Sequence, residues 1–241
     1  MEFDVFDYSS QGGREYNEDS VGYKIAGNSG IFVVADGLGG HQYGELASSC
    51  ICDVLVNSWN GEFMQDTAVW LQNQIALSNQ NILKLQQEKN AVLKSTVVAL
   101  VVDHGKAVWA NVGDSRLYYL HNDELMSYTN DHSVAYKKYK GGEISRDQIR
   151  TDEDQSALLK SVGSPDRNEP ELYQPVSLQP GDAFMLCSDG LWEHITDGEV
   201  LIDFLKAETA KEWAENLLLR AIERVNGKHD NLSVLTVIVT P

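Results

Sequence analysis

The chain has few cysteines, and they are badly placed for disulfide bonding. Only 3 occur in 241 residues. Cys50 and Cys52 lie two positions apart on an expected helix, where side chains at that spacing point in different directions. Cys187 lies in an apolar run and is expected to be a small core residue. Because this pattern excludes the disulfide framework of a small secreted domain, we expect a reducing, cytoplasmic location.

Basic residues are also scarce. The chain has 19 lysines and arginines against 36 aspartates and glutamates, which gives a formal net charge of −17. A field of this sign repels polyanions, so it argues against a general nucleic-acid binder and against a protein that binds anionic membranes. A local basic site for one phosphate group is still compatible with it. Most of the acidic excess is expected on a solvated surface.

Long apolar runs are missing as well. The longest uninterrupted run covers residues 97–102, whereas a membrane span needs about 20 apolar residues. The first residues are acidic and lack the basic and then apolar pattern of a secretory signal, so no membrane association is expected. Apolar residues nevertheless make up 42% of the chain, which is enough for a sizeable core.

Strand-like segments dominate the sequence and follow one another at hairpin spacing. Helices are expected around residues 47–55, over residues 67–89, and twice after Asp197. The regular strand–helix alternation of a parallel sheet is absent, so the pattern predicts an α+β fold with antiparallel sheets packed face to face and helices outside. The expected strands are residues 3–8, 20–25, 31–35, 96–102, 106–112, 116–121, 124–128, 171–178, 182–187 and 232–240.

The stretch from about residue 131 to residue 170 differs from the rest of the chain. It contains Gly141 and Gly142, many charges and few core-like runs. We expect a flap inserted into a single domain that spans residues 1–241. No coiled coil or apolar stripe is left unassigned by these elements, so a monomer is expected.

Acidic residues recur where strands are expected to end. Asp36, Asp114 and Asp189 each stand beside a glycine after an apolar run, and Asp230 precedes the last strand. A single Asp-Gly pair after a strand is usually a turn. Several carboxylates brought together would repel one another unless hard divalent cations held them, and oxygen ligands suit Mg²⁺ or Mn²⁺. The repetition therefore predicts a metal site.

Two other interpretations of these motifs are disfavoured. The glycine-rich segment 37–40 is not followed by the Lys-Ser/Thr pair of a phosphate-binding P-loop. Ser188 lies beside Asp189, but the Gly-x-Ser-x-Gly elbow of a serine nucleophile is absent and no histidine is placed to activate it.

A set of short motifs, which span nearly the whole chain, resembles those of bacterial metal-dependent serine/threonine protein phosphatases, the PPM or type 2C family. The resemblance implies a four-layer α-β-β-α sandwich, in which two antiparallel sheets lie between helix pairs. The motifs occur in the order that is typical of the family. They are Arg14-Glu15-Tyr16-Asn17-Glu18-Asp19-Ser20, Val34-Ala35-Asp36-Gly37-Leu38-Gly39-Gly40-His41, Gly44-Glu45, Val112-Gly113-Asp114-Ser115-Arg116, Asp131-His132-Ser133, Ser188-Asp189-Gly190-Leu191-Trp192 and Asp230-Asn231-Leu232-Ser233.

The resemblance also implies a set of metal ligands for Mn²⁺ or Mg²⁺. Asp36 would bridge two ions. Asp189 and Asp230 would complete the shell of one ion, and Glu18 with the Gly37 carbonyl would complete the shell of the other.

Three further roles follow from the same resemblance. Asp19 would hold a metal-bound water, and Asp114 together with Asp189 would take a third, weaker ion. Arg14 matches the phosphate-binding arginine of the family, and its guanidinium suits a two-pronged grip on phosphate oxygens.

The implied activity is hydrolysis of phosphoserine and phosphothreonine in proteins, by direct attack of a metal-bridging hydroxide on phosphorus without a covalent enzyme intermediate. The expected partners are Ser/Thr-phosphorylated proteins, above all a bacterial Ser/Thr kinase and its targets. Two alternatives stay open, a catalytically weak phosphoprotein-binding module and a hydrolase of small phosphate esters.

Some positions depart from the family pattern or have an open role. Leu38 stands where eukaryotic relatives carry a histidine that is a favoured general acid. His41 could protonate the leaving alkoxide instead, although a metal-bound water could also serve. His132 is expected to be structural. Lys160 stands where many relatives have arginine, which could alter contacts between the flap and the substrate.

Overall fold

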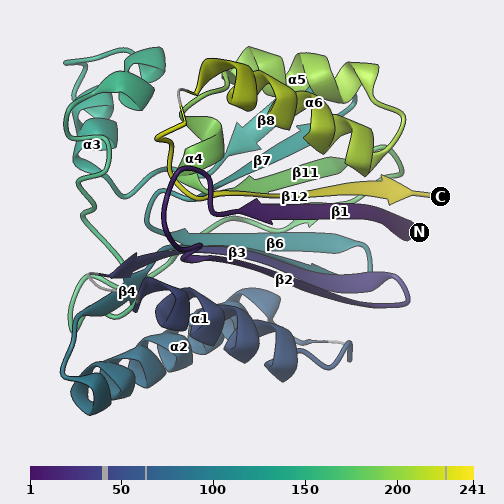
Figure 1. The fold of residues 1–241 in the computed structure, drawn as a ribbon. Coiled ribbons are helices and arrows are strands. Elements are labelled where there is room, and N and C mark those ends of the chain that lie inside the picture. The colour runs from purple at the N-terminus through teal and green to yellow at the C-terminus, as the bar shows by residue number, and fades with distance from the viewer. Residues whose placement is uncertain (40–42, 63, 226) are drawn as a thin grey trace.

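The computed structural model describes residues 1–39, 43–62, 64–225 and 227–241. In these ranges the chain forms two antiparallel sheets that stack face to face, with helices on both outer faces (Figure 1). This arrangement confirms the predicted α+β fold with four layers. Among the helices of the described ranges, none combines the length and the apolar character that a bilayer crossing requires.

The first sheet contains both ends of the chain. Its strands lie in the order β1-β12-β11-β7-β8. The terminal strands pair along their whole length, with Glu2 opposite Thr240 and Ser10 opposite Leu232, which explains why the two termini lie side by side in Figure 1. The strand bounds are β1 (Glu2–Ser10), β7 (Arg116–His121), β8 (Glu124–Tyr128), β11 (Ala183–Cys187) and β12 (Leu232–Thr240).

The second sheet brings Asp19 and Asp36 next to each other on neighbouring strands. Its main strands lie in the order β10-β6-β5-β3-β2, while β4 pairs with β3 and β9 pairs with β6. In the register of β2 and β3, Asp19 is directly opposite Asp36. The strand bounds are β2 (Asp19–Ala26), β3 (Ser29–Gly39), β4 (Leu93–Ser95), β5 (Val97–Asp103), β6 (Lys106–Val112), β9 (Glu171–Leu172) and β10 (Val176–Ser177).

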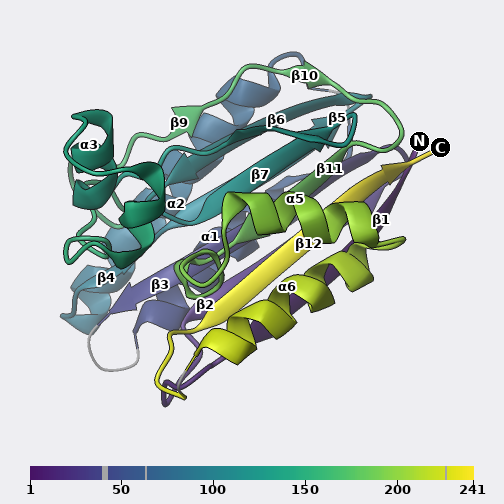
Figure 2. The ribbon, with the colours of Figure 1, turned by 90° about the horizontal axis from the view of Figure 1, so that it is seen from above.

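Two helix pairs cover the outer faces of the sheets. α1 (Gly44–Ser58) and α2 (Thr67–Lys89) pack on the second sheet, and α5 (Asp197–Lys206) and α6 (Ala210–Arg224) lie across the first (Figures 1 and 2). The ends of α2 have clear local causes. The Asp66 side chain accepts a hydrogen bond from the Val69 amide at its start, and Asn90 adopts a left-handed conformation after its last turn.

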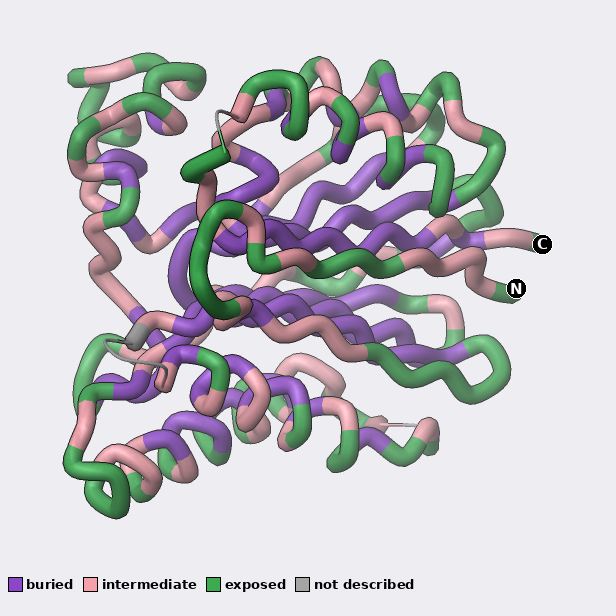
Figure 3. Tube along the Cα trace, in the orientation of Figure 1, coloured by how far each residue is buried: buried purple, intermediate pink, exposed green. Residues whose placement is uncertain are grey.

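The apolar core is divided by the sheets into three layers. The middle layer, between the two sheets, includes Phe32, Leu100, Trp109, Phe184 and Leu235. One outer layer lies under α1 and α2, and the other lies under α5 and α6. Figure 3 shows the consequence, since the inner strands are buried whereas the connecting loops are exposed. Stacked sheets of this kind hold their strand ends in fixed positions.

Most predicted elements match the structure, and the exceptions have local reasons. The expected single strand over residues 171–178 is wrong, because β9 and β10 are separate two-residue strands. Pro175 lies between them, and a proline has no N–H to donate to a sheet ladder. The short helix α4 (Asp189–Trp192) and strand β4 were not predicted, since elements of three or four residues leave no periodic signal.

The flap, residues 131–170, packs against the rest of the molecule. It contains α3 (Val134–Lys140) and the 3₁₀ helix η1 (Arg146–Thr151). Ala135, Tyr136 and Ile149 are buried in the same apolar layer as α4 to α6. Arg146 lies 3.3 Å above the ring of Tyr128 and forms a 2.5 Å ion pair with Asp197. These contacts support our proposal of one domain with a docked flap.

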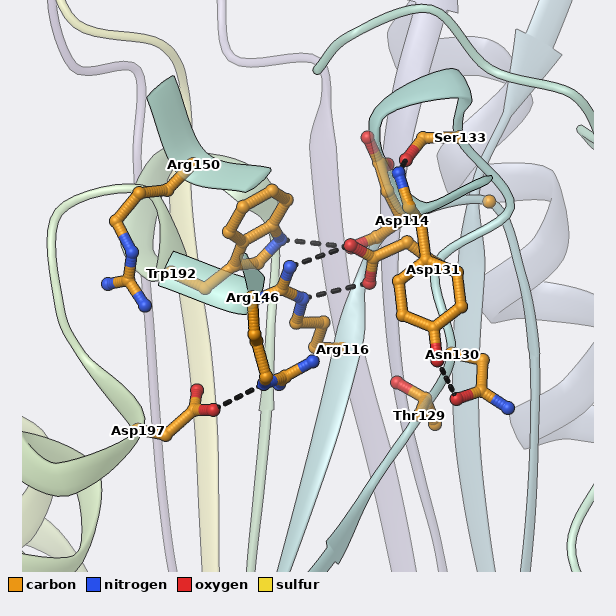
Figure 4. Close-up of polar contacts among 12 residues, drawn as sticks. Asp114, Arg116, Thr129, Asn130, Asp131, Ser133, Arg146, Arg150, Trp192 and Asp197 are labelled. Atoms are coloured by element: carbon orange, nitrogen blue, oxygen red, sulfur yellow. Dashed lines mark hydrogen bonds and ion pairs between the residues drawn. The ribbon is translucent and has the colours of Figure 1, made fainter. Parts of the chain in front are cut away.

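A buried ion pair joins the start of the flap to the first sheet. Arg116 on β7 donates from Nε and Nη2 to the two carboxylate oxygens of Asp131, at 2.8 and 2.6 Å. Its guanidinium lies 3.6 Å from the ring centre of Trp192, and the Trp192 indole donates to the Asp114 carbonyl at 2.9 Å (Figure 4). Strand β7, the flap and α4 therefore meet at one charged contact.

Removal of the Asp131 carboxylate should destabilise the protein strongly. Asp131→Ala leaves the buried Arg116 charge without a carboxylate partner, and such a loss costs about 3–5 kcal/mol. Urea unfolding should show a lower midpoint with an unchanged slope. Lys211→Ala is the matched control, because its ion pair with Glu215 is exposed and should contribute less than about 1 kcal/mol. Equal effects of the two substitutions would contradict this view of the buried pair.

Candidate metal centre

A cavity of about 310 Å³ opens at one end of the stacked sheets. In Figure 1 this end is marked by α4 and β4. Strand ends and short loops from both sheets supply its wall, so residues far apart in the sequence face one space. Seven of the predicted site residues line it: Arg14, Glu18, Asp36, Gly37, Asp114, Asp189 and Asp230.

Asp36 is anchored through its backbone where β3 meets β4 and β5. Its amide donates to the Thr96 hydroxyl at 3.0 Å. Its carbonyl accepts from the Thr96 amide and from the Ser95 hydroxyl, both at 2.8 Å. Backbone groups bonded in this way fix the direction of the carboxylate, which a mobile loop could not do.

Glu18 lies against two glycines that permit a very close approach of backbone. A Cβ on Gly37 would lie 2.2 Å from the Gly44 carbonyl oxygen, and a Cβ on Gly44 would lie 2.7 Å from Glu18 Oε1. The Gly44 amide, at the start of α1, donates to that same oxygen at 3.0 Å. Glycine is therefore required at both positions. Burial raises the pKa of Glu18, and the hydrogen bond from the Gly44 amide acts in the opposite direction.

Asp19 and Asp189 are brought together by the serine between the two sheets. Ser188 donates from its hydroxyl to Asp19 Oδ2 at 2.7 Å, and Asp189 follows it as the first residue of α4. Asp19 Oδ1 and Asp189 Oδ1 are buried and have no hydrogen-bond partner. Unpaired buried oxygens are unfavourable, so each of these atoms suits a bound cation or an ordered water.

Asn231 organises the loop that carries Arg14, a role that was missed by sequence reasoning. Its side-chain oxygen accepts from the Glu18 amide at 2.8 Å. Its side-chain nitrogen donates to the carbonyls of Gln11 and Tyr16, at 2.9 and 2.8 Å. The only sequence signal was its place beside Asp230, which gives no hint of contacts with a segment more than two hundred residues away.

Arg14 is directed at a predicted metal ligand rather than at empty solvent. Its Nη2 lies 2.5 Å from Asp230 Oδ2, although the Arg14 side chain is 60% exposed. The exposure leaves the remaining N–H groups accessible from the cavity side. An anion that enters the cavity would therefore meet a guanidinium already held in place at its rim.

The carboxylates around the cavity destabilise each other's charged forms. Loss of solvent is the main cause, and neighbouring carboxylates add to it. Burial raises the pKa of Asp19 to about 7 and the pKa of Asp189 to about 6. The pKa values of Asp36 and Asp114 are also raised well above the ordinary range, first by burial and then by nearby Asp189.

The donor atoms fit hard divalent cations. The side chains proposed here as metal ligands are all carboxylates, and two of their oxygens have no hydrogen-bond partner. Oxygen ligands are those that Mg²⁺ and Mn²⁺ prefer. Within the described ranges, no three histidine, cysteine or acidic side chains already form a closed cation cage. The carboxylates instead surround a shared space, an arrangement that suits ions completed by water and by the Gly37 carbonyl.

Of three further residues named in the sequence analysis, His132 and Lys160 are not among those that line the cavity in the described part of the chain. His41 lies outside the described residues. His132 bonds twice to Gly113, since its amide donates to the Gly113 carbonyl at 2.8 Å and its Nδ1 accepts from the Gly113 amide at 3.1 Å. These contacts fit the structural role that was predicted. Lys160 donates from Nζ to the Glu169 carbonyl at 3.2 Å.

Divalent cations should stabilise the chain, and Asp36 should determine that response. Mn²⁺ at about 100 times its Kd should add about 2.7 kcal/mol to the free energy of unfolding, and each 1 kcal/mol raises Tm by about 2–4 °C. Metal-free Asp36→Asn should melt a few degrees above the metal-free parent chain, because one buried charge is gone, yet it should lose most of the Mn²⁺ response.

Thermal melts with chelator and with Mn²⁺ measure both effects. Glu215→Gln, an exposed carboxylate on α6, is the control and should keep the full response. If Asp36→Asn responded to Mn²⁺ like the parent chain, Asp36 would not belong to the cation site.

Comparison with known proteins agrees with this geometry. A family described as Protein phosphatase 2C matches residues 8–221. The serine/threonine phosphatase stp of Listeria monocytogenes serotype 4b is 32% identical over 231 residues, covering 93% of this chain and 90% of the relative.

Solved structures with a similar fold are also serine/threonine phosphatases. Stp1 from Staphylococcus aureus aligns with a TM-score of 0.89 at 27% identity, covering 100% of this chain and 96% of the other. The catalytic domain of the phosphatase PstP in complex with 2 manganese ions aligns with a TM-score of 0.86 at 26% identity, covering 99% of each chain. The chain therefore belongs to the protein phosphatase 2C family.

Proposed function

We propose that the protein is a metal-dependent serine/threonine phosphatase, which hydrolyses phosphoserine and phosphothreonine in other proteins. The observation that carries the proposal is the cavity itself, in which buried carboxylates from both sheets surround a space with Arg14 at its rim. Family membership supports the same activity, since the relatives above are described as serine/threonine phosphatases.

The cations would be held by oxygen atoms of the cavity wall. We propose that Asp36 is shared by two ions, with Asp189 and Asp230 on one side and Glu18 and the Gly37 carbonyl on the other. When bound, such ions lower the pKa of water and offset the charge on phosphoryl oxygens.

Two more aspartates would extend the centre. Asp114 and Asp189 line the same cavity, and the two together would take a third and weaker ion. Asp19 would accept a hydrogen bond from an ion-bound water through its unpaired Oδ1, while Ser188 holds the other oxygen in place.

Arg14 would orient the phosphoryl group. Its planar guanidinium can donate two parallel hydrogen bonds to phosphate oxygens, which a lysine cannot do. If Arg14 turned from Asp230 to a phosphate group, the Asp230 carboxylate oxygen that it now contacts would become free to bind a cation. Binding of phosphate and completion of the cation site are thus linked through one 2.5 Å contact.

Water would attack phosphorus directly in this mechanism, without a covalent enzyme intermediate. Leu38 lines the cavity and cannot donate a proton to the leaving alkoxide. His41 therefore stays the candidate general acid among the nearby residues of the sequence, with water as the alternative. Hydrolysis of small phosphate esters and binding of phosphoproteins without turnover are the alternative functions.

The cellular setting belongs to the proposal as well. We expect a monomer in the cytoplasm that reverses the action of a Ser/Thr kinase. All three cysteines are free thiols, which is compatible with a reducing compartment.

Activity should depend on both the cation and Asp36. A phosphothreonine peptide should be hydrolysed with Mn²⁺ and spared in excess chelator. Asp36→Ala should lower kcat/KM by at least about 100-fold. Substitution of a residue that only orients a metal ligand usually lowers activity by about 10- to 100-fold, and loss of the ligand itself should cost more. Glu215→Gln should retain activity. Hydrolysis that persists in chelator, or in Asp36→Ala, would exclude the mechanism.

Substitution of Arg14 should separate charge from geometry. Arg14→Ala should lower kcat/KM on an aryl phosphate by about 10- to 100-fold, the range typical of a lost charged hydrogen-bond donor in an active site. Arg14→Lys restores the charge but not the two-pronged geometry, so it should recover only part of the loss. Full recovery by lysine would indicate that charge alone matters. Steady-state kinetics at saturating Mn²⁺ distinguish these results.

A further inference from the structure

A second cavity lies beside the candidate metal centre. It has a volume of about 330 Å³, and Leu158 lines both cavities. We call it the Lys94 pocket, after the residue that β4 contributes. Its polar lining consists of Lys94, Lys160, Ser161, Ser164, Asp166 and Arg167. Because Leu158 borders both cavities, a group bound in the Lys94 pocket would lie next to the first cavity.

The charge of this pocket is opposite to that of the whole molecule. Three cations face one carboxylate, that of Asp166, in a chain with a formal net charge of −17. Lys94, Lys160 and Arg167 form no ion pair with a carboxylate of the described residues. Lys160 donates to the neutral Glu169 carbonyl, so no described carboxylate offsets these charges by an ion pair, and they create a local positive field beside an acidic cavity.

The loop that carries these groups is fixed by the second sheet and by α2. Val162 and Ser95 exchange backbone hydrogen bonds of 2.8 and 3.0 Å. Gly163 has a φ of +91° and leaves no room for a Cβ, which would lie 2.5 Å from the Leu93 carbonyl oxygen. Its amide donates to Asn79 Oδ1 at 2.6 Å. The pocket is therefore preorganised, which lowers the cost of binding a ligand there.

Two buried hydroxyls add a neutral donor to the cations. Ser161 Oγ and Ser164 Oγ lie 2.9 Å apart, and both residues are buried. One hydroxyl hydrogen is used between them, so the other is left to donate elsewhere. Arg167 is held in the left-handed region at a φ of +60°, which residues other than glycine adopt rarely, and its carbonyl accepts from the Ser161 amide at 3.3 Å.

We propose that the Lys94 pocket binds a second anionic group of the substrate, on the same polypeptide as the phosphoserine or phosphothreonine that is hydrolysed. The inference rests on the proposed function and deepens it. A phosphoryl group or a carboxylate has the charge and the acceptor oxygens that lysine, arginine and hydroxyl donors recognise. The enzyme would then prefer phosphorylated segments that carry a further phosphate or an acidic residue.

The separation of the two cavities sets the spacing in the substrate. An extended peptide advances about 3.3 Å per residue, so a group a few residues from the hydrolysed phosphoryl group is expected to reach the neighbouring cavity. The pocket also resolves an electrostatic difficulty. A strongly acidic enzyme repels acidic peptides at long range, whereas local cations offset that repulsion at short range.

Three matched phosphothreonine peptides test the proposal. The first has neutral flanks, the second has aspartates three residues away, and the third has a phosphoserine there. With Mn²⁺, kcat/KM should be about tenfold higher for at least one of the anionic peptides than for the neutral one. The size of the preference for each peptide tells whether the pocket takes a carboxylate or a phosphoryl group.

Substitutions in the pocket should abolish this preference. Each of these cations should contribute about two- to fivefold, so Lys94→Gln with Arg167→Gln should bring the ratio of the kcat/KM values close to one. Lys94→Arg keeps the charge and should keep most of the ratio. Lys211→Gln, on α6, is the remote control and should leave the ratio unchanged. High salt should reduce the preference of the parent chain.

Two results would overturn the proposal: no preference in the parent chain, or a preference that survives in the double variant. Because the readout is a ratio, a partly unfolded variant lowers all three rates without altering it. A parent chain that hydrolyses all three peptides equally would still be a phosphatase. A parent chain that hydrolyses none of them with Mn²⁺ would instead refute the proposed function.

Discussion

Mutual repulsion of buried carboxylates is the constraint around which this molecule is arranged. Asp36 lies inside β3 of one sheet, which continues to Gly39 beyond the end at residue 35 that the sequence predicts, and Asp189 follows a strand of the other. Stacking of the two sheets brings both into one cavity, where burial raises their pKa values. Backbone bonds to Asp36 and the Ser188 hydroxyl on Asp19 hold the carboxylates there. A cation-binding site is thus built at a cost in stability, which bound cations offset.

Neutral hydrogen-bonding side chains and a buried ion pair hold the segments around the cavity in place. Asn231 ties the loop around Arg14 to the last strand, and the buried pair of Arg116 and Asp131 ties the flap to the first sheet. The flap itself contributes Leu158 to the first cavity and Arg167 to the Lys94 pocket. One docked insertion therefore shapes both the proposed catalytic cavity and the proposed subsite beside it.

Elements with a long periodic pattern could be predicted, whereas short ones could not. The helix over residues 67–89 and the strands at 106–112 and 232–240 have the predicted bounds, because each presents a repeated apolar face or a continuous apolar run. The strand expected over 171–178 is interrupted at Pro175, and α4 is a single turn. A local break or a single turn is decided by contacts that periodicity does not record.

The sequence by itself determined the chemistry of the site: acidic residues at strand ends, glycines beside them, and an arginine in a family motif. Tertiary structure alone decided which charges are buried, that Arg14 contacts Asp230 across 216 positions, and that Asn231 holds the loop between them. It also placed Lys94 beside Lys160 and Arg167. The physical reason is that side-chain types and local spacing are written in the chain, whereas burial and long-range contact arise only when the two sheets pack together.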